Sequence, residues 1–206
     1  VVCLSPSTAG FAFDLGIEAV ADPSCAPGKS NVVIVDDFAV TSEPACDDRP
    51  VPNGDFEAAV DTGWDGQGFE IVEDPAAAHS GGRYLELRAS CPGGATVYPW
   101  VATVPMRDPS KPGGAALKMW YRLPAGVRLD LSAGDVLGLE ARHRLDPAES
   151  WTEKVTCLSG HVWGRRVRIL VDLYSTSPED GSCVAEPAVF QLDDVSIGPD
   201  PSCPDG

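Results

Sequence analysis

Four aromatic side chains in the middle of the sequence, Tyr98, Trp100, Trp120 and Trp151, have the chemistry needed to hold a sugar. The apolar faces of sugar rings stack on exposed aromatic rings, while their hydroxyl groups hydrogen-bond to nearby amides and carboxylates. Amides are scarce, because the whole chain holds two Asn and two Gln. In a strand, Trp120 and its neighbour Tyr121 point to opposite faces, so only one of them faces outward. We regard the four residues as candidates for sugar binding, with packing in a core as the alternative for each.

The sequence contains no arrangement typical of a catalytic centre. It lacks the G-x-S-x-G turn of serine hydrolases, the H-E-x-x-H pair of zinc proteases and a Gly-rich phosphate loop. Its three histidines, His79, His143 and His161, are far apart in the sequence. We therefore expect a protein that is not an enzyme.

The net charge of the chain limits the kinds of partner that it can bind. With a formal net charge of -16, the surface repels phosphate backbones and anionic lipid headgroups. No run of 18 apolar residues is present, so no segment reads as a membrane span. We expect neither nucleic-acid binding nor membrane insertion.

Seven cysteines occur at wide spacings, without a C-x-x-C pair or a Cys/His cluster at zinc spacing. Disulfides explain such cysteines better than a metal site, and disulfides persist in oxidising compartments. The sequence therefore predicts a disulfide-bonded protein that is secreted or displayed on the cell surface.

The two ends of the chain resemble each other. Residues 3–5 and 157–159 both read Cys-Leu-Ser, and residues 36–37 and 193–194 are both Asp-Asp, which indicates a tandem repeat of about 155 residues. The organisation that follows is the C-terminal third of a preceding copy, a linker and one complete module, over residues 1–47, 48–52 and 53–206. The partial copy has two apolar strands that need a partner, supplied either by missing sequence or by another chain.

The complete module reads as all-β. Short alternating segments are separated by Gly, Pro, Asp and Ser, and almost nothing has the period of a helix. About eight antiparallel strands in 150 residues favour a double-sheet jelly-roll β-sandwich. The strands that we expect are Phe69–Val72, Tyr84–Ala89, Thr96–Val104, Ala115–Arg122, Val136–Arg144, Trp151–Leu158, Arg165–Tyr174 and Val189–Ile197.

Motifs at the edges of the module carry a family resemblance. The segments 51–57, 79–87 and 190–197, together with Trp64, are similar to those of the galactose-binding-like jelly rolls. Within that superfamily the module most resembles the carbohydrate-binding modules of bacterial xylanases and related glycosidases. The resemblance implies a jelly-roll sandwich in which these edge motifs meet, and the capacity to bind polysaccharide.

The same resemblance implies a structural Ca²⁺ ion. The matching ligand positions are the backbone carbonyl of Asp55, the carboxylate of Glu57, the loop at Ser80, the carbonyl of Arg83 and the carboxylate of Asp193. Six to eight carboxylate and carbonyl oxygens suit calcium. Where some relatives have an acid in the loop this chain has Ser80, so we expect a weakened site.

The positions of the cysteines suggest pairings without fixing them. Cys157 and Cys183 flank one strand and its loop, as Cys3 and Cys25 do in the partial copy, so we expect local bridges for both pairs. Cys91 and Cys203 should both lie at the end of the sandwich remote from the implied calcium, which favours their pairing and leaves Cys46 unpaired. A bond between Cys46 and Cys91 is the rival.

Two functions follow as hypotheses. The favoured one is a structural module of an extracellular fibre or stalk, with other copies of the module or chain as partners through tandem repeats or strand exchange. The alternative is a calcium-stabilised carbohydrate-binding module of a larger secreted protein or glycosidase, with polysaccharide as its partner.

Overall fold

The computed structural model describes residues 49–58, 63–99, 102–135, 141–176, 182–183 and 187–204. The predicted partial copy with Cys3, Cys25 and Cys46, and the candidate Trp100, lie outside the described residues. Among the described residues we find no helix with the length and hydrophobicity that a membrane span requires.

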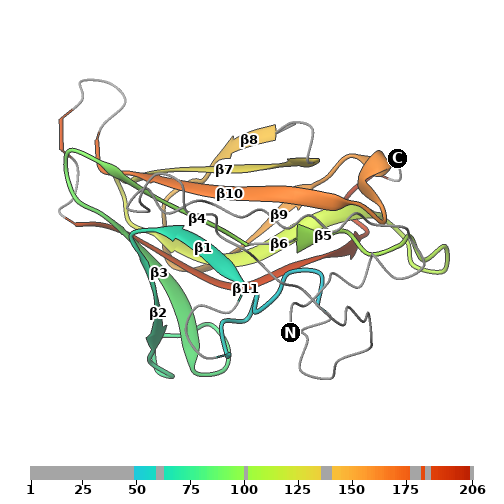
Figure 1. Cartoon of the computed structure of the whole chain (residues 1–206), viewed down its shortest axis with the longest axis horizontal. Coiled ribbons are helices and arrows are strands. Elements are labelled where there is room, and N and C mark those ends of the chain that lie inside the picture. Colours follow the sequence, from blue (N-terminus) through green and yellow to red (C-terminus); the bar gives the residue numbers. More distant parts are fainter. Residues whose placement is uncertain are drawn as a thin grey trace, which may run out of the picture.

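The described chain forms two antiparallel sheets that pack face to face, which confirms the predicted all-β sandwich. The first sheet has six strands in the order β1-β4-β10-β7-β8, with β5 also paired to β10, and the second has five in the order β2-β3-β11-β6-β9. In Figure 1 strands of the six-stranded sheet, such as β7 and β10, run above β11 and β3 of the five-stranded sheet. The strands of the six-stranded sheet are β1 (Trp64–Gln67), β4 (Gly94–Pro99), β5 (Ala102–Thr103), β7 (Arg128–Asp135), β8 (Ala141–Arg144) and β10 (Arg166–Tyr174). Those of the five-stranded sheet are β2 (Phe69–Glu73), β3 (Arg83–Ala89), β6 (Gly114–Leu123), β9 (Ala148–Cys157) and β11 (Ala188–Asp200).

The core lies between the sheets because apolar residues alternate along the strands. On β10 the residues Val167, Ile169, Val171 and Leu173 are buried, while those between them face outward. From the other sheet, buried residues alternate with outward ones over Leu117–Leu123 of β6 and Ala188–Leu192 of β11. Burial of these apolar faces, at roughly 25 cal/mol per Å², is the main force that holds the sheets together.

The start of the described chain belongs to this core. Val51 is buried, and the carbonyl of Pro50 accepts a hydrogen bond of 2.8 Å from the amide of Thr103. Trp64 is buried against Phe56, and its indole N–H donates to the carbonyls of Pro52 and Asn53 at 3.1 and 3.2 Å. These contacts fix the segment before β1 against β1 and β5 of the six-stranded sheet.

The module is disulfide-bonded as predicted, but the expected pairs Cys157–Cys183 and Cys91–Cys203, and the rival bond between Cys46 and Cys91, are wrong. The bonds join Cys91 to Cys183 and Cys157 to Cys203, with Cα–Cα distances of 5.7 and 5.3 Å. We expected Cys157 to bond Cys183 because they flank one strand. That strand is β10, whose nine residues carry the chain roughly 30 Å along the sandwich, so the two cysteines lie at opposite ends.

The register of the sheets accounts for the observed bonds. Cys157 ends β9 and Cys203 follows β11, and both strands flank the first residues of β6: Cys157 pairs with Ala116, and the amide of Gly114 donates to the carbonyl of Cys203 at 2.9 Å. The other bond lies at the far end of β10. There Ser175 donates its amide to the carbonyl of Gly93, in the turn that contains Cys91, and Thr176 forms a bridge with Cys183.

Candidate functional site

Two of the acids implied as calcium ligands hold the turn at residues 79–83 between them. Glu57 Oε1 accepts hydrogen bonds from the amides of Gly82 and Arg83, at 2.8 and 2.9 Å. Asp193 Oδ2 accepts from the amides of His79 and Ser80, at 3.0 and 3.2 Å. The structure thus brings Glu57 to Arg83 and Asp193 to Ser80, as the resemblance implies, and the turn joins the two pairs.

Asp193 sits at a distorted point of β11. The register between β11 and β6 shifts between Asp193 and Ser196, and the next residue, Asp194, has a φ of 49°. The side chain of Asp193 is buried, and its Oδ1 accepts a third amide, that of Asp194, at 2.8 Å. Burial raises the pKa of Asp193 to about 6, although the amide hydrogen bonds oppose the rise.

Amide groups of the turn occupy one oxygen of each of these acids. Glu57 Oε1 and Asp193 Oδ2 each accept two N–H groups, so a calcium ion would bind through the other carboxylate oxygens, Glu57 Oε2 and Asp193 Oδ1. The carboxylate of Asp55, two residues before Glu57, pairs with Arg49 at 2.5 Å. In this geometry amide donors stabilise the turn, and calcium binding stays a prediction of the family resemblance.

A loop covers the aromatic candidates on the outer face of the five-stranded sheet. The imidazole of His79 stacks on the indole of Trp120, with centroids 3.9 Å apart and planes within 15°. The indole N–H of Trp151 donates to the carbonyl of Ala77 at 2.8 Å, and its ring meets the edge of Tyr84. Trp120 and Trp151 are therefore brought together, as sequence could not tell, but loop residues lie against both rings.

His79 is also held by a hydrogen bond to Asp194. Its Nδ1 lies 2.6 Å from Asp194 Oδ2, and Ser80 Oγ donates to Asp194 Oδ1 at 2.8 Å. One ligand atom each from His79, Asp193 and Asp194 lies within 4.8 Å of the others. Each of these groups already has a partner within the turn, so the trio acts as a clamp on the loop over Trp120.

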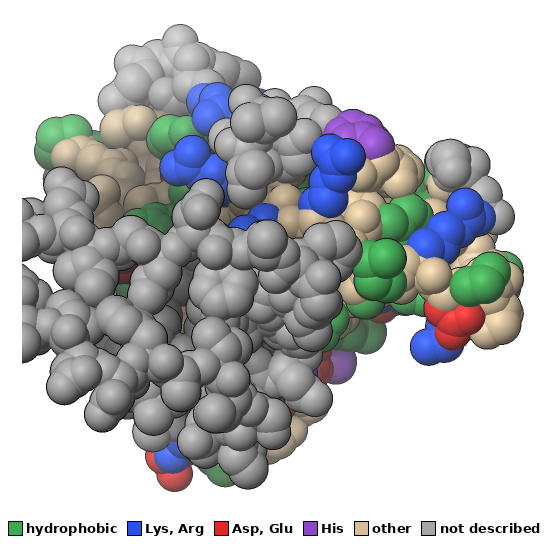
Figure 2. Space-filling view, turned by 45° about the vertical axis from the view of Figure 1, so that its right-hand side comes forward, with side chains coloured by type: hydrophobic (Ala, Val, Ile, Leu, Met, Phe, Trp, Pro, Cys, Tyr) green, Lys and Arg blue, Asp and Glu red, His purple; other side chains and the backbone are tan. Residues whose placement is uncertain are grey.

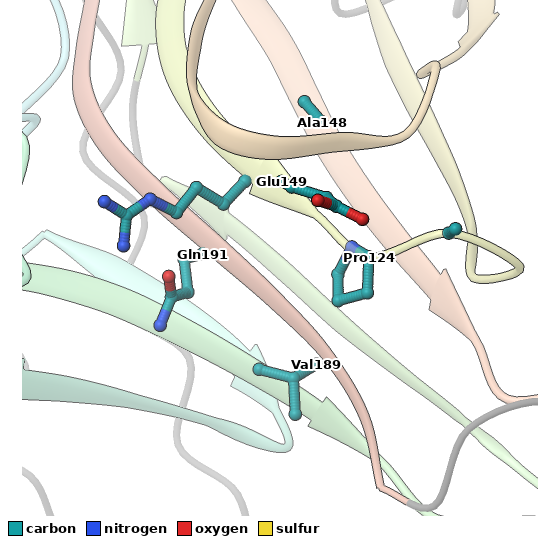
Figure 3. Close-up of a pocket in the computed structure, with 7 residues that line it drawn as sticks. Pro124, Ala148, Glu149, Val189 and Gln191 are labelled. Atoms are coloured by element: carbon teal, nitrogen blue, oxygen red, sulfur yellow. The ribbon is translucent and has the colours of Figure 1, made fainter.

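A hollow of about 330 Å³ opens beside this cluster, on the same outer face. Figure 3 shows Glu149 on one side of it, Val189 and Gln191 on the other, and Pro124 between them. The residues that line the hollow come from β6 and the turn after it, from β9 and from β11: Arg122, Pro124, Ala125, Ala148, Glu149, Val189 and Gln191. Such a hollow, with apolar walls and a few polar groups, has the make-up of a small-molecule site.

The polar groups of the hollow are held in place by their neighbours. Gln191 Nε2 donates to Glu86 Oε2 at 3.0 Å and to the Tyr84 hydroxyl at 3.3 Å, which leaves the carbonyl oxygen of Gln191 as an acceptor. The guanidinium of Arg122 lies 4.7 Å from the centroid of the Trp151 ring. The ring thus serves as a support for Arg122, and this cation–π contact limits the rotamers of a long side chain.

Glu149 is exposed, whereas the other polar residues of the hollow, Arg122 and Gln191, are half-buried. No hydrogen bond or ion pair joins its carboxylate to any residue that the structure describes. The hollow therefore offers a free carboxylate, a fixed amide oxygen and a fixed guanidinium. Sequence reasoning missed all three residues, and the one available signal was the rarity of glutamine, since Gln191 is one of two in the chain.

Tyr98, the remaining aromatic candidate, lies on the opposite sheet. Its hydroxyl donates to Asp65 Oδ2 at 3.2 Å, directly across β1 and β4, and this hydrogen bond raises the pKa of Tyr98. The ring is half-buried. The structure thus separates Tyr98 from Trp120 and Trp151 by the full thickness of the sandwich.

Comparisons with known proteins place the fold. No protein-family model and no curated protein matches the sequence. Among solved structures, the carbohydrate-binding module TmCBM61, in complex with β-1,4-galactotriose, matches with a TM-score of 0.53 and 16% identity, over 72% of this chain and 96% of that module. An exo-β-agarase matches with a TM-score of 0.51 and 15% identity, over 73% of this chain and 25% of the enzyme. The predicted two-sheet β-sandwich is confirmed, and the chain shares this fold with the module TmCBM61.

Proposed function

We propose that this chain is a non-catalytic carbohydrate-binding module of an extracellular protein, and that it holds a neutral sugar in the hollow between β6, β9 and β11. The fold supports the class of function, since a module of the same architecture was solved with a galactose oligomer. The observation that carries the proposal is the hollow itself, with its free carboxylate, amide and guanidinium over apolar walls.

The chemistry of the hollow suits a sugar. The methyl groups of Val189 and the ring of Pro124 form apolar walls against which the C–H face of a sugar ring can pack. Hydroxyl groups on the other face then have two acceptors, Glu149 and Gln191, and one donor, Arg122. A volume of about 330 Å³ is at the lower end for ligand sites, so we expect one or two sugar units of a chain to enter it.

The predicted fibre or stalk finds its basis in residues 1–47, which lie outside the described residues. The tandem repeat and the unpaired cysteine therefore stay hypotheses. A disulfide-bonded sandwich agrees with an oxidising environment, and we retain the exterior of the cell as the expected location.

A matched pair of glutamates on β9 tests the proposal. Glu149→Ala removes the free carboxylate of the hollow. Glu153→Ala is the control, because Glu153 is also exposed and lies on β9 opposite Trp120 of β6, outside the lining of the hollow. A glycan array first identifies the sugar, and titration calorimetry then compares the variants. A lost hydrogen bond between a charged group and a sugar costs about 1.5–3 kcal/mol, so Glu149→Ala should weaken binding at least tenfold.

The control should bind as the parent does. Equal losses in the two variants would contradict a role for the hollow, and an array without any bound glycan would contradict the proposed function. Unfolding by urea checks that both variants remain folded, since neither carboxylate has a partner among the described residues.

A further inference from the structure

Four arginines lie on the outer face of the six-stranded sheet, opposite the hollow. Arg142 and Arg144 alternate on β8, and Arg166 and Arg168 alternate on β10, where the residues between them are buried in the core. All four side chains are exposed. We call these four residues the arginine stripe.

The register of the sheet aligns the stripe as a diagonal. Strand β7 lies between β10 and β8, and its residues Gly134, Ser132 and Asp130 are the Cα partners of Arg168, Arg142 and Arg144. From Arg168 to Arg142 and from Arg142 to Arg144, the position along the strand direction thus changes by two residues. Arg166 lies two residues before Arg168 on β10 and extends the diagonal by the same amount. At about 3.3 Å per residue and about 4.8 Å between strands, the stripe is roughly 20 Å long.

Few acids neutralise the stripe. Asp130 is buried beneath it, where it forms an ion pair of 2.7 Å with Arg128 and lies 3.8 Å from Arg144. For Arg142, Arg166 and Arg168, no carboxylate within the described ranges is at ion-pair distance. Figure 2 shows Lys and Arg side chains along the upper part of the described surface, where acidic side chains are scarce.

This local charge has the opposite sign to that of the chain, which carries -16 overall. In physiological salt, screening limits the range over which exposed charges interact to about 8 Å. A charged group that approaches the stripe therefore interacts with its arginines rather than with the distant acids. Guanidinium groups bind carboxylate and sulfate oxygens in bidentate geometry, which a row of lysines would not do.

An aromatic ring lies beside the stripe. The hydrogen bond to Asp65 raises the pKa of Tyr98, and the positive charge of Arg168 opposes that rise, which requires the guanidinium to be near the phenol. The Cα partner of Asp172 on β10 is Thr96, two residues before Tyr98 on β4, so the ring stands next to the middle of β10. The surface thus combines cations with a half-buried ring, the two groups that an anionic sugar can use.

We propose that the arginine stripe is a second binding surface, and that its ligand is an anionic polysaccharide with carboxylate or sulfate groups spaced along an extended chain. The choice of a glycan rests on the proposed function, while the preference for negative charge rests on the stripe alone. The four arginines bind successive anionic groups, and Tyr98 packs against a sugar ring between them.

Affinity electrophoresis of the full chain tests the stripe, with polygalacturonate, dextran sulfate or neutral dextran cast into the gel. We expect the carboxylated polymer, the sulfated polymer or both to retard the chain, with retardation that falls as salt rises, and no effect of neutral dextran. Which anionic polymer acts identifies the group recognised. The variant Arg142→Gln/Arg168→Gln should lose at least about tenfold in affinity, since it removes two charged hydrogen-bonding groups.

Two further variants keep the result specific. Lys111→Gln/Lys154→Gln makes the same change of net charge away from the stripe and should bind within about twofold of the parent. Glu149→Ala should bind anionic polymers normally, so failure of the hollow and failure of the stripe are distinguishable. The proposal is overturned if neither anionic polymer retards the chain, if the lysine variant loses as much affinity, or if duplex DNA is bound equally well. Self-association of the chain at low salt that the arginine variant abolishes would also overturn it, because the stripe would then bind a second copy.

Discussion

The disulfides offer the sharpest test of the topology. Cys91 and Cys183 are 92 residues apart in sequence and Cys157 and Cys203 are 46 apart. The chain-entropy model gives about 4.6 kcal/mol of stabilisation for the longer loop and about 4 for the shorter one. We therefore expect Cys91→Ala/Cys183→Ala and Cys157→Ala/Cys203→Ala each to lower the free energy of unfolding by about 4 kcal/mol, with the first pair lower by about 0.6 more.

Urea unfolding of the full chain measures these losses, and mapping of unreduced peptides identifies the bonds. Trypsin alone does not separate the two pairings, because no Lys or Arg follows Arg168 and Cys183 shares a peptide with Cys203. A second cleavage on the N-terminal side of Asp193, by an Asp-specific protease, separates them. A peptide that links Cys157 to Cys183, or a loss below about 1 kcal/mol for both variants, would refute the reasoning.

Three further outcomes follow from the contacts. Trp151→Phe keeps a ring beneath Arg122 but removes the hydrogen bond to Ala77, so urea unfolding should show a loss of about 1 kcal/mol while sugar affinity stays within about twofold; an unchanged stability would contradict the hydrogen bond. Hydrogen bonds from Lys118, and then from Ser202, lower the pKa of Asp200 to about 2. The ionised carboxylate therefore stabilises the fold fully above its pKa in the unfolded chain, near 3.9, and this stabilisation is lost as the pH falls through 2. The parent should therefore lose more stability between pH 4 and pH 2 than Asp200→Asn does, and equal urea midpoints at every pH would refute this. The calcium site that the resemblance implies would use the less occupied carboxylate oxygens, Glu57 Oε2 and Asp193 Oδ1, so calcium should raise the melting temperature and EDTA should reverse the rise; a change below about 1 °C would contradict the calcium prediction.

Regular alternation made most strands predictable from sequence. The apolar residues of β6, β10 and β11 recur at every second position, and the predicted segments coincide with these strands to within a few residues. Strand β7 was missed although Leu129 and Leu131 alternate, because Asp130, Ser132 and Gly134 between and after them lower the local strand propensity. The sheet supplies what the local sequence lacks, since β7 pairs along its full length with β10.

The disulfides and the hollow were beyond sequence reasoning for one shared reason. Both depend on which strands become neighbours, and β11 lies between β3 and β6 although β6 ends at Leu123 and β11 begins only at Ala188. Glu149 and Gln191 line one hollow from two strands of that sheet without a common motif. The edge motifs did better: segments 79–87 and 190–197 do meet, because Asp193 accepts the amides of His79 and Ser80.

The central claim is that a sugar binds in the hollow, and backbone and side-chain chemical shifts of the labelled chain, followed during titration with the glycan that an array selects, test it most directly. The account predicts that saturation shifts the signals of Glu149 and Gln191 and the guanidinium of Arg122, and leaves those of Glu153 unchanged. Shifts confined to residues outside the hollow, or none with any glycan, would contradict it.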